Sequence, residues 1–127
     1  MALIFSAMTS MAAHAADVVR YKAASPNSPI ATAVEVPAGM TTIYLSGQVP
    51  PVINTTVPAS SIEAYGDTKT QTIGTLTRIK AALAELGLTL KDVVKVQVFL
   101  VADPKLGKMD FAGFSEAYAQ FFGGEQT

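Results

Sequence analysis

The side chains that could do chemistry in this 127-residue chain are of few kinds. There is no cysteine, which excludes disulfides, thiolate zinc sites, iron–sulfur clusters and cysteine nucleophiles. The one histidine is His14, and the only arginines are Arg20 and Arg78. Apart from His14, the chain offers only carboxylate, lysine, arginine, tyrosine and hydroxyl groups. A mature chain without His14 would have neither a Ser-His-Asp triad nor a histidine-rich metal site. Because no phosphate-binding glycine motif occurs either, we expect no metal ion and no cofactor.

The histidine lies in an apolar N-terminal stretch. Residues 1–15 carry no charge and close with Ala13-His14-Ala15, the small-residue pattern of a signal-peptidase site. We therefore expect residues 1–15 to be a signal peptide cleaved before Ala16, and the mature protein to be periplasmic or secreted. The first positive charge is Arg20, so the basic segment that usually opens such a signal is missing. The alternative is an apolar helix that stays in the mature fold.

Composition predicts one folded domain over residues 16–127. Half of the residues are hydrophobic and 15% are charged, which is enough apolar material for a core and unlike a disordered chain. Nine Lys and Arg against ten Asp and Glu give a formal net charge of −1, without the basic surface that nucleic-acid binding usually needs. After cleavage of the signal, we expect neither nucleic acid nor a membrane as a partner.

Strands are expected in the first half of the chain. Residues rich in Val, Ile, Thr and Tyr predict strands at Val18–Lys22, Ala31–Val36 and Thr41–Val49, and the short linker between the last two predicts a hairpin. Residues 50–66 carry several prolines and hydroxyls without periodicity, which predicts a surface loop.

Two helices and one strand are expected in the second half. Asp67 is placed to cap a helix that runs to about Leu86 and stops at Gly87. Val93–Val101 is β-branched and alternates like a strand. Asp110 begins a second helix, whose aromatic stripe we expect to be core: Phe111, Phe114, Tyr118, Phe121 and Phe122.

The order of these elements predicts that the sheet is incomplete at its C-terminal end. A β–α–β–α unit normally returns a further strand that covers its second helix. Only Glu125-Gln126-Thr127 follow the stop signal Gly123-Gly124. We therefore expect a C-terminal segment that this sequence does not contain.

Several runs, in this order and spacing, point to one family. They are YLSGQVP at residues 44–50, LAELGL at 83–88, DVVKVQVFL at 92–100, FAGF at 111–114 and YAQFF at 118–122. Together they resemble the Rid/YjgF family over about residues 30–124. Its best-known members are small trimeric 2-iminobutanoate/2-iminopropanoate deaminases, and the family is also described as endoribonuclease L-PSP-like.

The resemblance implies an α+β fold like that of chorismate mutase. It would be a mixed β-sheet with two helices packed on one face, here lacking the family's last strands, in a homotrimer with clefts between subunits. In deaminating members, an Arg after the second helix holds the substrate carboxylate and a Glu on the last strand positions water, so that an imine or enamine hydrolyses without a cofactor. Neither position exists in this chain, so we assign no catalytic residue.

The resemblance also implies a substrate-binding site. Ser46-Gly47-Gln48 matches the run that lines the family's cleft, where glycine allows close approach to the backbone and glutamine offers an amide. The same run also fits a strand end with glycine at a bulge. Ile30 stands where deaminating members have Tyr, and Ser115 stands where they have Asn. We expect these five residues to lie at the site.

Two functions stay open at this point. The first is a secreted Rid-family hydrolase, a deaminase that, when complete, converts small carboxylate-bearing imines to 2-oxo acids and ammonia. The second is a non-catalytic trimeric protein of the same fold that binds a small ligand or a partner, which the departures at Ile30 and Ser115 favour. RNA cleavage is a third function, and the acidic charge balance argues against it.

Overall fold

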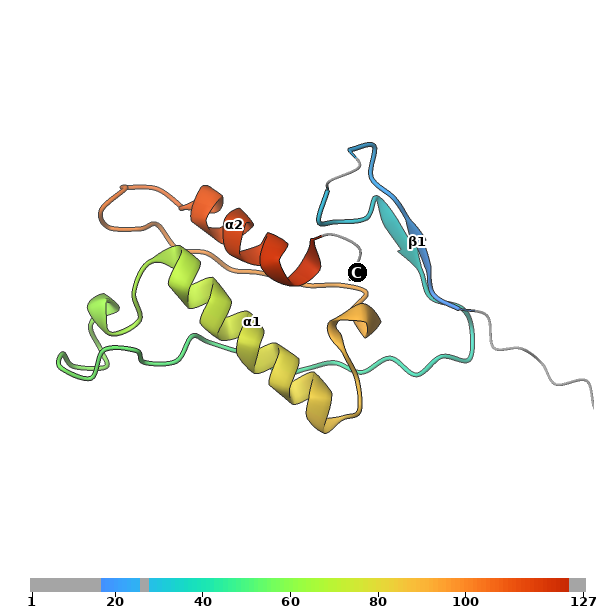
Figure 1. Ribbon diagram of the computed structural model, residues 1–127, viewed down its shortest axis with the longest axis horizontal. Coiled ribbons are helices and arrows are strands. Elements are labelled where there is room, and N and C mark those ends of the chain that lie inside the picture. Colours follow the sequence, from blue (N-terminus) through green and yellow to red (C-terminus); the bar gives the residue numbers. More distant parts are fainter. Residues whose placement is uncertain (1–16, 26–27, 124–127) are drawn as a thin grey trace, which may run out of the picture.

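The computed structural model describes residues 17–25 and 28–123, which form a small α+β arrangement (Figure 1). In chain order the elements are strands β1 (Val19–Tyr21) and β2 (Ala33–Glu35), the 3-10 helix η1 (Ile62–Ala64), helix α1 (Thr68–Glu85), the 3-10 helix η2 (Leu90–Asp92) and helix α2 (Phe111–Phe122). No helix among them is long and apolar enough to span a bilayer. The signal peptide expected at residues 1–15 lies outside the described residues.

Helix α1 begins and ends as its sequence predicts. The Asp67 side chain accepts a hydrogen bond from the Thr70 backbone N–H at 2.8 Å, which caps the first turn. At the other end Gly87 has a φ of +72°, and the Leu88 N–H donates to the Leu83 carbonyl at 2.9 Å. This is a Schellman stop, in which glycine takes the left-handed position without a Cβ penalty.

Helix α2 is capped in the same way and packs against α1 (Figure 1). The Asp110 carboxylate accepts from the Gly113 N–H at 2.9 Å. On the surface of the helix pair, the Lys69 ammonium meets the Glu116 carboxylate at 2.8 Å. The buried apolar residues of the described chain are few, and four of the five lie on these two helices: Ala64, Leu76, Leu83, Ala117 and Phe122.

The aromatic stripe of α2 is only partly core. Phe111, Phe114, Tyr118 and Phe122 form a row with successive ring centroids 5.9, 5.5 and 4.7 Å apart. Phe122 is 6% exposed, but Phe111 is 65% exposed, so the expectation of a core residue is wrong there. The reason is that α1 covers only part of the stripe. Burial raises the pKa of the Tyr118 phenol.

The described sheet is one antiparallel pair, β1 with β2, in which Arg20 lies opposite Val34. The strand expected at Val18–Lys22 is confirmed in this place. The hairpin expected between Ala31–Val36 and Thr41–Val49 is wrong, because β2 takes β1 as its partner. A turn after β2, with Gly39 at a φ of +92°, leads the chain away from the pair (Figure 1).

Residues 41–49 and 93–101 run as extended chain without arrows in Figure 1. Neither segment pairs with another in the described part of the protein, so the strands expected at Thr41–Val49 and Val93–Val101 are not formed there. The physical reason is that a strand needs a hydrogen-bonded neighbour, and no described segment supplies one. Some of their large side chains lie open to solvent: Tyr44 is 90% exposed, Phe99 85% and Val101 80%.

Candidate functional site

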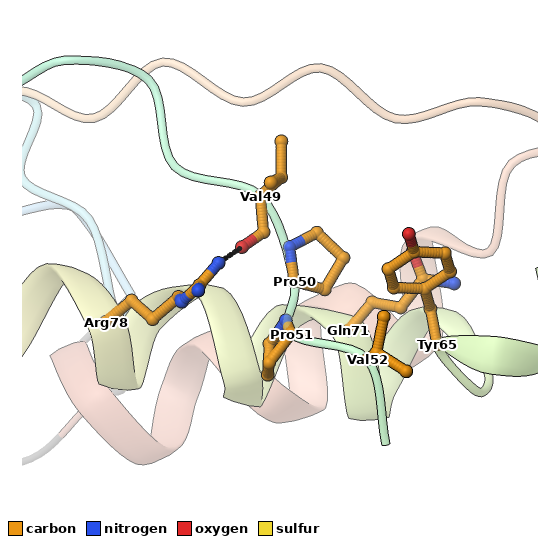
Figure 2. Close-up of a pocket in the computed structure, with 7 residues that line it drawn as sticks. All are labelled: Val49, Pro50, Pro51, Val52, Tyr65, Gln71 and Arg78. Carbon is orange, nitrogen blue, oxygen red and sulfur yellow. Dashed lines mark hydrogen bonds between the residues drawn. The ribbon is translucent and has the colours of Figure 1, made fainter. Parts of the chain in front are cut away.

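A hollow with a volume of about 500 Å³ lies where residues 49–52 pass along α1 (Figure 2). Its lining consists of Val49, Pro50, Pro51, Val52, Tyr65, Gln71 and Arg78. We call it the Arg78 hollow. It is an open surface depression with a mostly apolar wall and a few polar groups.

A glycine in the middle of α1 lets residues 49–52 approach the helix. A Cβ built on Gly74 would lie 2.6 Å from Cδ of Pro51, closer than two carbons can pack. Glycine in a helix interior costs roughly 1 kcal/mol relative to alanine. Here that cost is offset by the close packing of the proline ring on the helix.

Arg78 ties the same segment to the helix by a hydrogen bond. Its Nη1 donates to the Val49 carbonyl at 3.0 Å, as the dashed line in Figure 2 shows. At the other end of the hollow, Gln71 Nε2 donates to the Gly66 carbonyl at 2.8 Å, and the Tyr65 hydroxyl donates to the Ala59 carbonyl at 2.8 Å. The polar groups of the lining are therefore held by the backbone around them.

The charge of the lining is positive. Arg78 is its one ionised side chain, and no Asp, Glu, His or Lys stands among the seven lining residues. A guanidinium beside proline and valine suits a carboxylate that carries a small apolar group. The lining contains no carboxylate or imidazole that could act as a general base.

The residues expected from sequence to bind substrate lie partly beside this hollow. Ser46 and Gly47 are exposed and Gln48 is half-buried, immediately before Val49 of the lining. The Gln48 amide reaches the Ser46 carbonyl at 3.5 Å, at the outer limit of a hydrogen bond. A Cβ on Gly47 would meet nothing within 4 Å, so this face of the run is open.

Ser115 and Ile30 make their hydrogen bonds elsewhere in the described chain and not with Ser46-Gly47-Gln48. The Ser115 hydroxyl donates to the Phe111 carbonyl at 2.8 Å, within α2. Ile30 is 63% exposed, and its N–H donates to the Ser28 hydroxyl oxygen at 3.3 Å. No hydrogen bond in the described part of the chain joins either residue to Ser46-Gly47-Gln48.

Sequence reasoning missed Arg78, Gly74 and Pro51 as parts of a site. Arg78 lies in mid-helix, outside the arginine position that the resemblance implies, so no sequence pattern marks it as a site residue. Gly74 carried a usable signal, since an isolated glycine in an apolar helix often marks a close approach. The approach of Pro51 joins residues distant in sequence, which no local pattern encodes.

Comparisons with known proteins agree on one family. Residues 23–127 match the family described as Endoribonuclease L-PSP. A RutC family protein of Pyrococcus abyssi is 36% identical over 102 residues, which is 80% of this chain and 70% of the relative. A RutC family protein of Pyrococcus horikoshii is 37% identical over 81 residues, 64% of this chain and 56% of the relative. Protein DfrA of Myxococcus xanthus is 38% identical over 96 residues, 76% of this chain and 65% of the relative. The chain thus spans between 56% and 70% of these relatives.

Proposed function

Because this chain belongs to the Endoribonuclease L-PSP family, we propose that it binds small carboxylate-bearing imines or related acids at Ser46-Gly47-Gln48. The observation that carries the proposal is the position of this run. It lies on unpaired, solvent-exposed chain that leads directly into the Arg78 hollow. Exposed hydroxyl, amide and backbone groups next to a cation can hold the polar end of such a molecule.

We also propose a trimeric assembly. For a form with the further strands that the resemblance implies, we place the cleft between subunits of a homotrimer, with Ser115 and Ile30 near the run. In that form, residues 41–49 and 93–101 would be strands of a mixed sheet with both helices on one face. Support comes from the exposed apolar side chains of these two segments, since large exposed apolar groups mark contact surfaces. Light scattering on that longer form should give three times its chain mass, and a monomer would contradict the trimer.

Imine hydrolysis is the reaction that such binding would serve. Water adds to the C=N carbon and the C–N bond then breaks, which yields a 2-oxo acid and ammonia. We propose turnover only for a form with an Arg and a Glu at the positions that the resemblance implies, because the Arg78 hollow has no carboxylate to position water. The 127-residue chain should release no ammonia from 2-iminobutanoate above the spontaneous rate, and turnover would show that other residues catalyse.

A stable keto acid tests the binding itself. Titration with 2-oxobutanoate, followed by calorimetry, should show saturable binding that Gln48→Ala weakens several-fold. The matched control is Gln97→Ala, since Gln97 is an exposed amide on the other extended segment. Absence of binding to the unaltered chain, or equal losses in both variants, would refute the assignment of the run.

RNA is a different substrate class, suggested by the word endoribonuclease in the family description. We propose that this chain does not act on RNA, because its formal charge of −1 gives no general attraction for a polyanion. Incubation with a labelled single-stranded RNA should leave it intact, and cleavage by the purified chain would contradict this.

We also propose that the protein is exported. Cleavage after Ala15 would place the binding domain in the periplasm or outside the cell, motivated by the apolar run and Ala13-His14-Ala15. Intact mass of the protein from its native host should begin at Ala16. A chain that retains Met1 would contradict export by this route.

A further inference from the structure

We propose that Arg78 and Gly74 are positioning residues: they hold residues 49–51 on α1 and so set the place of the run Ser46-Gly47-Gln48 beside the helix. The inference rests on the proposed function and adds to it the parts of the fold that position the site. It is carried by two contacts between residues 49–51 and one face of α1 (Figure 2).

The two contacts lie about one helical turn apart. Arg78 Nη1 donates to the Val49 carbonyl at 3.0 Å, and a Cβ built on Gly74 would lie 2.6 Å from Cδ of Pro51. Residues four apart in a helix lie on the same face, so Gly74 and Arg78 are neighbouring points on the surface of α1. Contact at two points fixes both the distance of the segment from the helix and its direction.

The segment between the two contacts is stiff. The rings of Pro50 and Pro51 fix their φ angles, and a residue before proline, here Val49, is restricted to extended conformations. Gln48 is bonded directly to Val49, so its place is constrained as well. The run has no strand partner in the part of the chain that the structure describes, so no ladder holds it. A site held in place before the ligand arrives loses less entropy on binding.

The first arm of the test breaks each contact by a different chemical change. Arg78→Gln removes the guanidinium donor and should weaken 2-oxobutanoate binding about fivefold, which is what the loss of one ordinary hydrogen bond amounts to. Gly74→Ala adds a carbon against Pro51, leaves the charge unchanged, and should weaken binding by a similar factor. Arg78→Lys keeps an N–H donor for the Val49 carbonyl and should recover most of the affinity. Circular dichroism checks that each variant is folded.

Two exposed positions of α1 outside the lining of the Arg78 hollow supply matched controls. Lys80→Gln removes a cation, and Thr77→Ala removes a hydroxyl that donates to the Ile73 carbonyl within the helix. Both variants should bind 2-oxobutanoate like the unaltered chain. A loss in Lys80→Gln equal to that in Arg78→Gln would reduce the effect to net charge. An equal loss in Thr77→Ala would reduce it to helix stability, and either result would overturn the proposal.

The second arm separates positioning from direct contact with the acid and from general support of the fold. A double-mutant cycle measures 2-oxobutanoate affinity in Gln48→Ala, with and without Arg78→Gln or Gly74→Ala. Residues that act through the run have little left to position once the Gln48 amide is gone. Both changes should therefore lose most of their effect in this background. The same loss in both backgrounds would mean that they act by another route, which overturns the proposal.

The outcomes also separate this inference from the proposed function. Unchanged affinity in folded Arg78→Gln or Gly74→Ala, while Gln48→Ala binds more weakly, would overturn the positioning role and leave the run as the site. No binding to the unaltered chain would refute the proposed function and this inference together.

Discussion

The helix pair and the two extended segments differ in how they satisfy their backbone hydrogen bonds and in where they place their apolar side chains. Helices α1 and α2 satisfy their backbone groups internally, are capped by Asp67 and Asp110, and bury apolar side chains against each other. Residues 41–49 and 93–101 contain equally apolar sequence, but leave their backbone without a ladder and their largest side chains exposed.

This contrast shows which elements local sequence alone can specify. A helix closes its hydrogen bonds within a few residues, whereas a strand depends on a neighbour from elsewhere. The open segment that carries Ser46-Gly47-Gln48 is for the same reason accessible to ligands or to other chains.

The largest expected effect is the difference in unfolding free energy between truncating a buried and an exposed apolar side chain. Leu83→Ala should lower the free energy of unfolding by about 3 kcal/mol, because the Leu83 side chain on α1 is 5% exposed and its removal leaves a cavity. Phe99→Ala, at a side chain that is 85% exposed, should change it by less than about 0.5 kcal/mol. Urea unfolding of both variants measures the difference. An equal cost for Phe99→Ala would show that residues 93–101 are packed in solution.

A smaller effect probes a close contact between α1 and the chain that directly follows residues 41–49. Gly74→Ala would usually stabilise a helix by roughly 1 kcal/mol, but the added carbon would press on Pro51, and overpacking costs typically 1–3 kcal/mol. We expect a net loss of about 1 kcal/mol by thermal or urea unfolding.

Gly47→Ala is the matched control, because its Cβ would meet nothing and its backbone is not left-handed. It should be close to neutral. A clear gain in stability from Gly74→Ala would mean that Pro51 does not rest on α1 in solution.

The same contrast explains how much the sequence could predict. Asp67 and Gly87 mark the two ends of α1 and Asp110 marks the start of α2 through local hydrogen bonds, and the sequence predicts all three. Val93–Val101 has strong strand character, but whether it pairs depends on a partner that its own residues cannot supply. At the site, the family resemblance predicts the exposed run Ser46-Gly47-Gln48. The Arg78 hollow beside it is visible only in the structure.

The smallest effect concerns the cap of α1. Hydrogen bonds from the Thr70 side chain and backbone hold the pKa of the Asp67 carboxyl below its usual range. The unfolded chain therefore takes up this proton first as the pH falls. The stability from Asp67 is present above the ordinary aspartate pKa of about 3.9 and is lost as the pH drops through the lower folded value.

Asp67→Ala should accordingly cost about 1 kcal/mol at neutral pH and less at pH 3. Asp67→Asn keeps an oxygen acceptor and should retain most of the stability without that pH dependence. Urea unfolding at several pH values checks both variants. A cost for Asp67→Ala that does not change with pH would contradict the ionised cap.

Residue-resolved amide hydrogen exchange, with and without 2-oxobutanoate, tests most directly whether the ligand-binding run is open chain beside a stable helix pair. In the free protein, the interior amides of α1 should be protected, and those of Ser46, Gly47 and Gln48 should exchange almost as fast as in an unstructured peptide. Added 2-oxobutanoate should slow exchange at this run and leave the helix interior unchanged. Protection of the run equal to that of α1 in the free protein, or no response to the acid, would contradict the account.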